Sequence, residues 1–144
     1  MIMVLHFRIA EIKTQQFAIF PEKFVNGQEV RVESEFEFGL NDDYSRIRCL
    51  SRFNYLQNET LLMTCEIHNV FDIREDGTAL LKEQLRVPAD TLRYLATIAT
   101  GTARGIIHSK TEGTVLNPIV LPPINLVEVI NKDFVIGEIK KDTD

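Results

Sequence analysis

Three successive segments that alternate apolar and polar residues restrict the fold of this chain more than any other feature of its sequence. The segments 30–38, 47–55 and 61–73 each gather their apolar residues on one side and their polar residues on the other, which is the pattern of a half-buried strand. Short polar stretches at 41–43 and 57–59 have the composition of turns. Strands joined by turns this short pair in antiparallel order, so the pattern predicts a three-stranded meander.

The lengths of these turns predict the pairing register. A two-residue turn at 42–43 would place Glu33 opposite Arg52 on the polar face, and such a pair of opposite charges stabilises a sheet by about 0.2–1 kcal/mol. A three-residue loop between the next two strands would make Cys49 and Cys65 diagonal neighbours, about 7–8 Å apart, which is too far for an easy disulfide. We therefore expect two reduced cysteines in the core, as is usual in a reducing cytoplasm.

The N-terminal segment predicts a fourth strand. Residues 4–9 alternate in the same way, the phase slips at 10–12, and Pro21 ends the run. A slip of one residue in an alternating pattern indicates a β-bulge. The stretch 21–27 contains a proline and an Asn-Gly pair, which favour a loop. We predict that this loop is a crossing connection to the next strand.

A long helix is predicted after residue 87. Apolar residues from 92 to 106 recur every three or four positions, and Pro88 and Gly113 suit the start and the end of a helix. Its middle contains Gly101 and Gly105, each of which costs about 1 kcal/mol relative to alanine. These glycines would let another backbone come close, and two neighbours remain open: a helix of a partner subunit, or the chain's own sheet.

An apolar segment without regular periodicity follows the helix. Residues 114–126 are mostly aliphatic but contain three prolines, which exclude both a helix and a central strand. Because surface loops are ordinarily polar, we expect this segment to lie on another apolar surface. One or two helical turns are predicted at 127–131, and 138–144 is a charged tail.

Together these elements predict one α+β domain spanning 1–144. Its four-stranded antiparallel sheet, a meander plus a first strand joined by a crossing loop, covers about 3–76 and is packed by one long helix at about 88–111. A proline-rich crossing at 114–126 leads to a short C-terminal helix and tail at 127–144. A single domain is what a chain of 144 residues ordinarily forms.

The composition argues against several classes of function. Sixteen Lys and Arg residues against 21 Asp and Glu give a net charge of −5, which disfavours binding to nucleic acid or to an anionic membrane. No apolar run is long enough for a transmembrane helix, so no membrane insertion is expected. The three histidines are scattered, without the ligand spacing of a metal site. We expect a cytoplasmic protein that binds no metal and no cofactor.

The order of these elements resembles that of the SecB family of export chaperones. In the family, an aromatic residue lies early in the long helix, an arginine-glycine pair lies near its end, and a proline-containing crossing follows. The stretches that carry the resemblance are Leu5-His6-Phe7-Arg8-Ile9 with the exit at 17–21, Thr64-Cys65-Glu66-Ile67, and the run from Leu92-Arg93-Tyr94 through Ala103-Arg104-Gly105 to Leu121-Pro122-Pro123-Ile124-Asn125-Leu126.

The resemblance implies a holdase chaperone that binds unfolded preproteins or other non-native polypeptides without ATP. It also implies a homo-oligomer, a dimer of dimers. In the family the polypeptide binds in long apolar grooves beside the two crossings, and a receptor for unfolded chain needs such a surface. The corresponding residues here are Phe17, Ile19, Phe20, Phe24 and Val25 in the first crossing and Leu116, Ile119, Val120, Leu121, Ile124 and Leu126 in the second.

The resemblance makes the SecA motor a candidate partner. In the family, acidic residues on the outer face of the sheet and at the exit of the first strand contact SecA. The outer face here carries Glu33, Glu35, Glu37 and Glu66. At the first-strand positions this sequence has Gln16 and Phe20 instead of acids. A SecB-like chaperone dedicated to another client, such as an antitoxin or a phage protein, is therefore an alternative.

The residues alone leave a different class of function open. A curved four-stranded sheet that wraps a long helix also suits a binding module for a lipophilic small molecule. An enzyme is not expected, because acidic residues such as Glu66 and Asp72 fit a solvated outer face of the sheet, and no nucleophile–base pair is visible.

Overall fold

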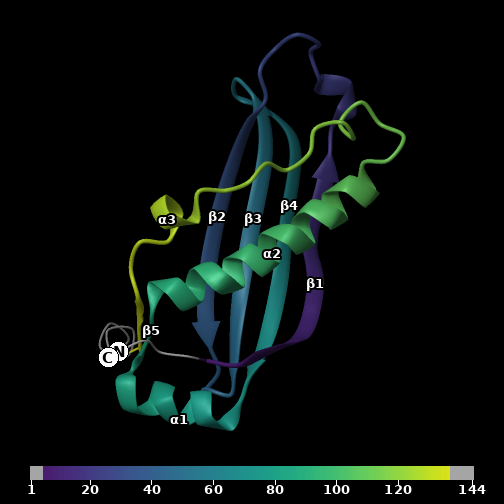
Figure 1. The fold of residues 1–144 in the computed structure, drawn as a ribbon. Helices are drawn as coiled ribbons and strands as arrows, with labels where there is room; N and C mark the ends of the chain where they lie inside the picture. The colour runs from purple at the N-terminus through teal and green to yellow at the C-terminus, as the bar shows by residue number, and fades with distance from the viewer. Residues whose placement is uncertain (1–4, 137–144) are drawn as a thin grey trace.

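The computed structural model describes residues 5–136. Four of its strands form one antiparallel sheet in the order β1-β4-β3-β2, so the predicted α+β class and four-stranded sheet are confirmed (Figure 1). The elements in chain order are β1 (Phe7–Ile19), the 3-10 helix η1 (Pro21–Lys23), β2 (Arg31–Leu40), β3 (Arg46–Gln57), β4 (Thr60–Ile73), α1 (Glu75–Gln84), β5 (Arg86–Val87), α2 (Ala89–Lys110), α3 (Leu126–Val129) and β6 (Phe134–Val135).

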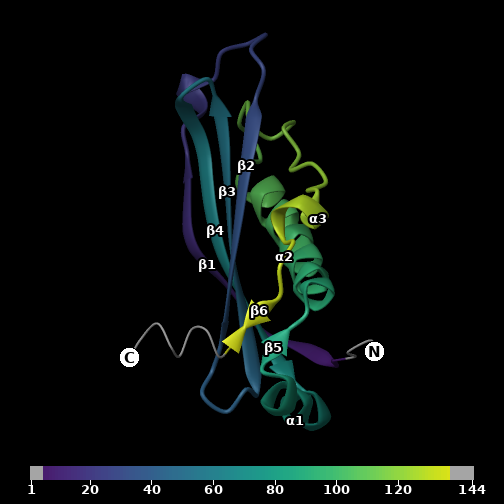
Figure 2. The same ribbon diagram turned by 90° about the vertical axis from the view of Figure 1, so that its left-hand side faces the viewer.

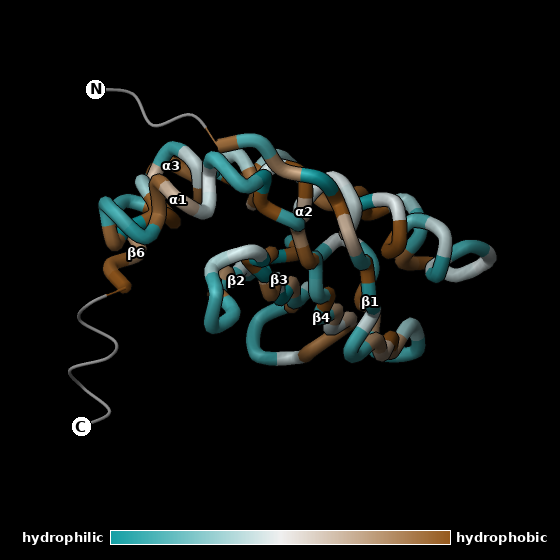
Figure 3. Tube along the Cα trace, turned by 90° about the horizontal axis from the view of Figure 1, so that it is seen from below, coloured by the Kyte–Doolittle hydropathy of each residue, from teal (hydrophilic) through white to brown (hydrophobic). Residues whose placement is uncertain are grey.

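The helices and the second crossing cover one face of the sheet only. Figure 2 shows α2, α3 and the segment between them on the same side of β2–β4, and in Figure 1 α2 runs obliquely across the strands. Polar and apolar residues follow one another along the chain in the sheet region (Figure 3). This alternation puts the apolar residues of β3 and β4 under α2 and leaves the polar residues on the opposite, outer face.

The core divides into two clusters along α2. One cluster lies toward α1 and includes Cys49, Phe71 and Leu95. The other lies toward the two crossings and includes Phe53 and Cys65. Small residues of α2 sit between helix and sheet, because its fully buried positions include the three alanines Ala96, Ala99 and Ala103.

The predicted register between β2 and β3 is wrong by two residues. The loop contains four residues, 42–45, and Glu35 rather than Glu33 lies opposite Arg52. The physical reason is Tyr44, which has a positive φ of 58° and packs its side chain into the core beside α1. A shift of two residues keeps every side chain on its predicted face.

The register between β3 and β4 differs in the same way. Asn58, with a positive φ of 54°, makes a two-residue turn, and a register shift between Tyr55 and Leu56 follows it. Cys65 therefore lies opposite Phe53 rather than Ser51. The two cysteines are not diagonal neighbours, and both are free and buried.

β1 contains the predicted bulge and a second one. The register against β4 shifts between Ile9 and Glu11, and again between Thr14 and Gln16. The first shift produces the phase slip that is visible in the sequence. The second falls in an uninterrupted polar stretch. Because apolar and polar residues do not alternate there, the sequence shows no sign of the shift.

Helix α2 begins and ends within one residue of its predicted limits. Its glycines do not contact the sheet: Gly101 and Gly105 are exposed, and a Cβ atom added at either would meet nothing within 4 Å. The sequence left two possible neighbours for these glycines, a helix of a partner subunit and the chain's own sheet. The structure excludes the sheet.

Besides η1 in the first crossing, the structure adds α1, β5 and β6, which the sequence pattern does not predict. Helix α1 follows β4 directly, and its Gly77 is required by packing, because a Cβ there would lie 2.8 Å from Cγ2 of Ile73. Strands β5 and β6 pair at the base of the molecule. There Asp133 accepts a hydrogen bond from the Ala89 backbone N–H (2.8 Å) and forms an ion pair with Arg86 (3.3 Å).

The C-terminal helix predicted at 127–131 is a single turn, α3, at Leu126–Val129. The charged tail predicted at 138–144 lies outside the described residues. No helix within residues 5–136 is long and apolar enough to cross a membrane.

Candidate functional site

The two crossings meet at the same end of the molecule. The segment between β1 and β2 and the segment between α2 and α3 both pass over the upper end of the sheet in Figure 1. Their apolar side chains pack against one core cluster, which buries Leu116 and Leu121. The half-buried side chains around it include Phe17, Ile19, Phe24, Ile119 and Ile124.

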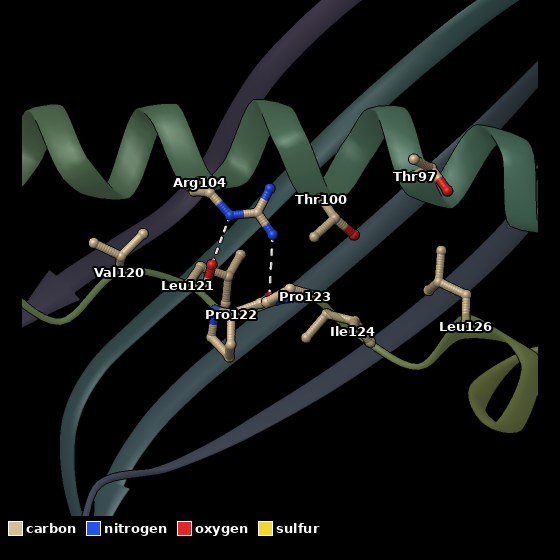
Figure 4. Close-up of a pocket in the computed structure, with 9 residues that line it drawn as sticks. All are labelled: Thr97, Thr100, Arg104, Val120, Leu121, Pro122, Pro123, Ile124 and Leu126. Atoms are coloured by element: carbon tan, nitrogen blue, oxygen red, sulfur yellow. Dashed lines mark hydrogen bonds between the residues drawn. The ribbon is translucent and has the colours of Figure 1, made fainter.

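An open hollow of about 580 Å³ lies between α2 and the second crossing. Figure 4 shows that α2 forms one wall and the proline-rich segment forms the other. Most of the exposed lining is apolar. The lining residues are Thr97, Thr100, Arg104, Val120, Leu121, Pro122, Pro123, Ile124 and Leu126.

Arg104 holds the proline-rich segment against the helix. Its Nε donates a hydrogen bond to the carbonyl oxygen of Leu121 (2.6 Å), and its Nη2 donates to that of Pro122 (3.1 Å). A third bond comes from the sheet, where the hydroxyl of Tyr55 donates to the carbonyl of Ile119 (3.4 Å). Prolines cannot donate main-chain bonds, so these side-chain donors replace the ladder bonds that a strand would have.

The first crossing is held by one buried amide. Gln57, at the end of β3, accepts a hydrogen bond from the Val25 N–H and donates to the Val25 carbonyl, both at 2.8 Å. It also donates to the carbonyl of Gln28 (3.2 Å). Two lysines cover aromatic rings nearby, Lys23 over Phe20 and Lys110 over Phe17.

The eleven residues predicted to form the groove fall into three groups by exposure. Leu116 and Leu121 are fully buried, whereas Val25 and Val120 are 47% and 56% exposed. The others are half-buried, namely Phe17, Ile19, Phe20, Phe24, Ile119, Ile124 and Leu126. Leu126 packs against the other core cluster, toward α1.

Only part of this set lines the hollow beside α2. Val120, Leu121, Ile124 and Leu126 do so, and no residue of the first crossing does. The sequence reasoning missed the helical wall of Thr97, Thr100 and Arg104 as site residues. The signal that could have found Arg104 is its position as a long side-chain donor near the end of the helix, followed along the chain by a segment whose prolines cannot form regular main-chain pairs.

The chemistry of the hollow is that of a binding surface. The chain's two thiols are buried and do not line the hollow, and burial raises the pKa of Cys65 to about 11 and that of Cys49 to about 12, so neither is a nucleophile at neutral pH. Burial also raises the pKa of Tyr55 to about 12. Within residues 5–136 no group of three His, Cys, Asp or Glu side chains could hold a metal ion.

The acidic residues predicted to face a partner lie on the outer face of the sheet, opposite α2. Arg52 pairs with three of them, Glu66 (3.0 Å), Glu35 (3.1 Å) and Glu37 (3.4 Å). Its hydrogen bonds with Glu66 and then Glu35 raise the pKa of the guanidinium. Glu33 pairs with Arg31 (2.7 Å).

Comparison with solved structures agrees with the resemblance seen in the sequence. The chain is similar to the SecB-like chaperone Rv1957 of Mycobacterium tuberculosis, whose structure is known in complex with a ChAD peptide from the antitoxin Rv1956 HigA1. The match covers 82% of this chain and 90% of that chain, with a TM-score of 0.51 and 18% sequence identity. No protein-family model matches the chain, and no curated protein matches it either. The fold is therefore SecB-like.

Proposed function

We propose that this protein is a holdase chaperone that binds non-native polypeptides without ATP, with the two crossings as its binding surface. The observation that carries this proposal is the open, apolar hollow between α2 and the second crossing. An unfolded chain presents apolar side chains in no fixed arrangement. Its receptor needs an accessible apolar surface rather than a set of converging polar groups.

A chaperone that serves one dedicated client is the alternative form of this function. The similar M. tuberculosis chaperone is in complex with an antitoxin peptide, which supports a client of that kind for this chain. The SecA motor has less support, because Gln16 and Phe20 stand at the two first-strand positions where acids were expected. Three of the outer-face carboxylates also already form ion pairs with Arg52.

The binding of one lipophilic small molecule is the second candidate function, but the geometry favours it less. Such a ligand is ordinarily enclosed on most of its surface. The hollow beside α2 is open, and Val120 on its rim is 56% exposed. We propose no catalytic role, since the acidic side chains of the outer face, such as Glu35 and Glu66, are paired with arginine.

We also propose that the functional unit is a homo-oligomer, a dimer of dimers. On β1, Ile9 and Ile12 are each 49% exposed, and Tyr94 of α2 is 58% exposed. The outward side of α2 carries Gly101 and Gly105, over which a second helix could approach closely. The free buried thiols support a reducing compartment such as the cytoplasm.

The proposed function is tested by the aggregation of an unfolded client. Thermally unfolded citrate synthase should aggregate less in the presence of the protein, with no nucleotide added. The double substitution Phe20→Ser with Val120→Ser should weaken this protection and leave the oligomer size, measured by light scattering, unchanged. A protein that stays monomeric and leaves aggregation unaltered would refute the proposal.

A further inference from the structure

Polar side chains interrupt the core beneath the middle of α2, where the two core clusters meet. On β4, the fully buried Asn69 lies between Ile67 of one cluster and Phe71 of the other. On β3, the fully buried Ser51 lies opposite Ile67, which makes it a diagonal neighbour of Asn69 on the face that packs against α2. The apolar contact between the sheet and the helix is therefore not continuous along the helix.

The side-chain amide of Asn69 makes this contact costly. Within residues 5–136, both its Nδ2 and its Oδ1 are buried without a hydrogen-bond partner. Ser51 is only slightly better placed, because its hydroxyl lies 3.5 Å from the carbonyl oxygen of Ile67, which is long for a hydrogen bond between two oxygen atoms. A buried polar group without a partner favours any state in which water reaches it. The middle of α2 is thus held to the sheet more weakly than its ends.

The same part of α2 consists of residues that weaken a helix. Gly101 and Gly105 are poor helix formers, and packing does not require them, since a Cβ atom at either would meet nothing within 4 Å. The hydroxyls of Thr97, Thr100 and Thr102 donate to the carbonyl oxygens four residues earlier, at 2.7 to 3.0 Å. The helix main chain uses the same carbonyls. Each hydroxyl therefore keeps a carbonyl bonded when the main-chain bond opens, and threonines in this arrangement bend helices.

The two halves of α2 are attached to different parts of the molecule. The N-terminal half buries two leucines in the cluster toward α1, and Arg93 fixes it to the carbonyl of Ile130 (2.7 Å). The C-terminal half buries Ala103 and Ile107 in the other cluster, and Arg104 fixes it to the second crossing. Alanine and isoleucine bury less apolar surface than two leucines do. The C-terminal half is accordingly the more easily displaced, and the second crossing is tied to it.

We propose that α2 contains a hinge at residues 97–102, on which its C-terminal half and the second crossing swing together away from the sheet. The helix is continuous in the structure, so the open state is the minor one of the two. The motion changes the shape of the hollow beside α2, because Thr97 and Thr100 of its wall belong to the hinge and Arg104 belongs to the moving half (Figure 4). The hinge is a property of the free protein and does not rest on the proposed chaperone function.

The test is amide hydrogen exchange of the full-length protein without a client. The amides of residues 101–106 bond to the carbonyls of the hinge. Corrected for intrinsic rates, they should exchange at least about tenfold faster than those of 93–96 and those of β3. Low concentrations of urea should accelerate exchange in β3 but not at 101–106, because opening a hinge exposes little surface. Equal protection along the whole of α2 would overturn the proposal.

A substitution beneath the helix tests the cause of the opening. Asn69→Leu replaces the unpartnered amide with an apolar side chain of similar size, so the open state no longer gains by solvating it. Exchange at 101–106 should slow at least about tenfold. The matched control is Asn54→Leu, the same change on the outer face of β3, which should leave exchange at 101–106 unaltered.

A substitution in the helix covers the case in which Asn69→Leu fails to fold. Gly101→Ala adds a methyl group in open space and raises helix propensity, so exchange at 101–106 should slow about fivefold. The control Ser109→Ala also raises propensity but lies outside the hinge, near the end of α2, and should leave these rates unchanged. If neither Asn69→Leu nor Gly101→Ala slows exchange at 101–106, α2 has no hinge there. Because no client is present, either result leaves the chaperone function to be decided by the aggregation experiment.

Discussion

The sheet and the second crossing are both rich in apolar residues, but they are stabilised in different ways. Phe53 and Tyr55 in the sheet are fully buried, and their strand, β3, pairs with β2 on one side and with β4 on the other. The crossing buries Leu116 and Leu121 but leaves Val115 and Val120 about half exposed. Burial thus accounts for the stability of the sheet, whereas the crossing also needs side-chain hydrogen bonds to hold it in place. The apolar surface of the crossing that stays exposed is accessible to a partner.

The largest expected effect is in the sheet. Phe53→Ala removes a fully buried ring from the cluster beneath the crossings, where it stacks edge-on against Phe36 with ring centroids 5.8 Å apart. We expect the free energy of unfolding to fall by about 3–5 kcal/mol. Urea denaturation would show this loss, and a change below about 1 kcal/mol would mean that the cluster does not hold the sheet and the crossings together.

The buried part of the crossing should come next. Leu121→Ala leaves a cavity at a position that is 1% exposed, and such changes cost about 2–5 kcal/mol. Because the crossing has no ladder and can collapse more readily than the sheet, we expect a value near the lower limit. A loss equal to that of Phe53→Ala in the same urea experiment would remove the distinction between the two regions.

Arg104 should have a smaller effect that is specific to the crossing. Arg104→Ala removes both hydrogen bonds to the carbonyls of Leu121 and Pro122, and we expect a loss of about 1–2 kcal/mol. Arg104→Lys keeps the charge but not the two-pronged geometry, so it serves as the matched control and should recover part of the loss. Amide exchange should accelerate in residues 119–126 and stay unchanged in β3 and β4; acceleration throughout the sheet would argue against a local role.

The smallest expected effect is at the base of the molecule, far from both regions. A hydrogen bond from Arg74 lowers the pKa of Asp76 from 3.8 to about 2. Because the pKa is lowered on folding, the stabilisation is present above 3.8 and is lost as the pH falls toward about 2. The melting temperature of the wild type should therefore decline more steeply over that interval than that of Asp76→Asn. Parallel curves would contradict this contribution, which solvent screening keeps small.

The sequence predicts the regions that follow a repeating pattern. Alternation locates β2, β3 and β4 and assigns their faces, and the three-to-four-residue period locates α2 to within one residue. Both registers are wrong by two residues. The buried side chain of Tyr44 lengthens the first loop by two residues, whereas in the second the tight turn at Asn58 shortens the loop by one residue and the register shift between Tyr55 and Leu56 adds the other. Whether a turn residue packs its side chain into the core cannot be predicted from the residues of the turn alone.

The sequence predicts only one of the two walls of the candidate site, the wall formed by the second crossing. The prolines and aliphatic residues of 114–126 indicate an apolar segment that must lie on something, and this segment forms one wall of the hollow. The other wall is helical, and Thr97, Thr100 and Arg104 belong to it because of the angle at which α2 crosses the sheet (Figure 4). Helix α1 and the β5–β6 pair are missed for a similar reason, since they depend on contacts between segments distant in sequence.

The central claim is that unfolded polypeptide binds at the exposed apolar surface of the crossing, and two matched valines test it most directly. Val120 and Val115 are 56% and 47% exposed on the same segment, but only Val120 lines the hollow. The measurement is the affinity of each valine-to-serine variant for a permanently unfolded, carboxymethylated protein. We expect Val120→Ser to bind about fivefold to tenfold more weakly than the wild type, and Val115→Ser to bind equally well. Equal affinities for all three proteins would contradict the account.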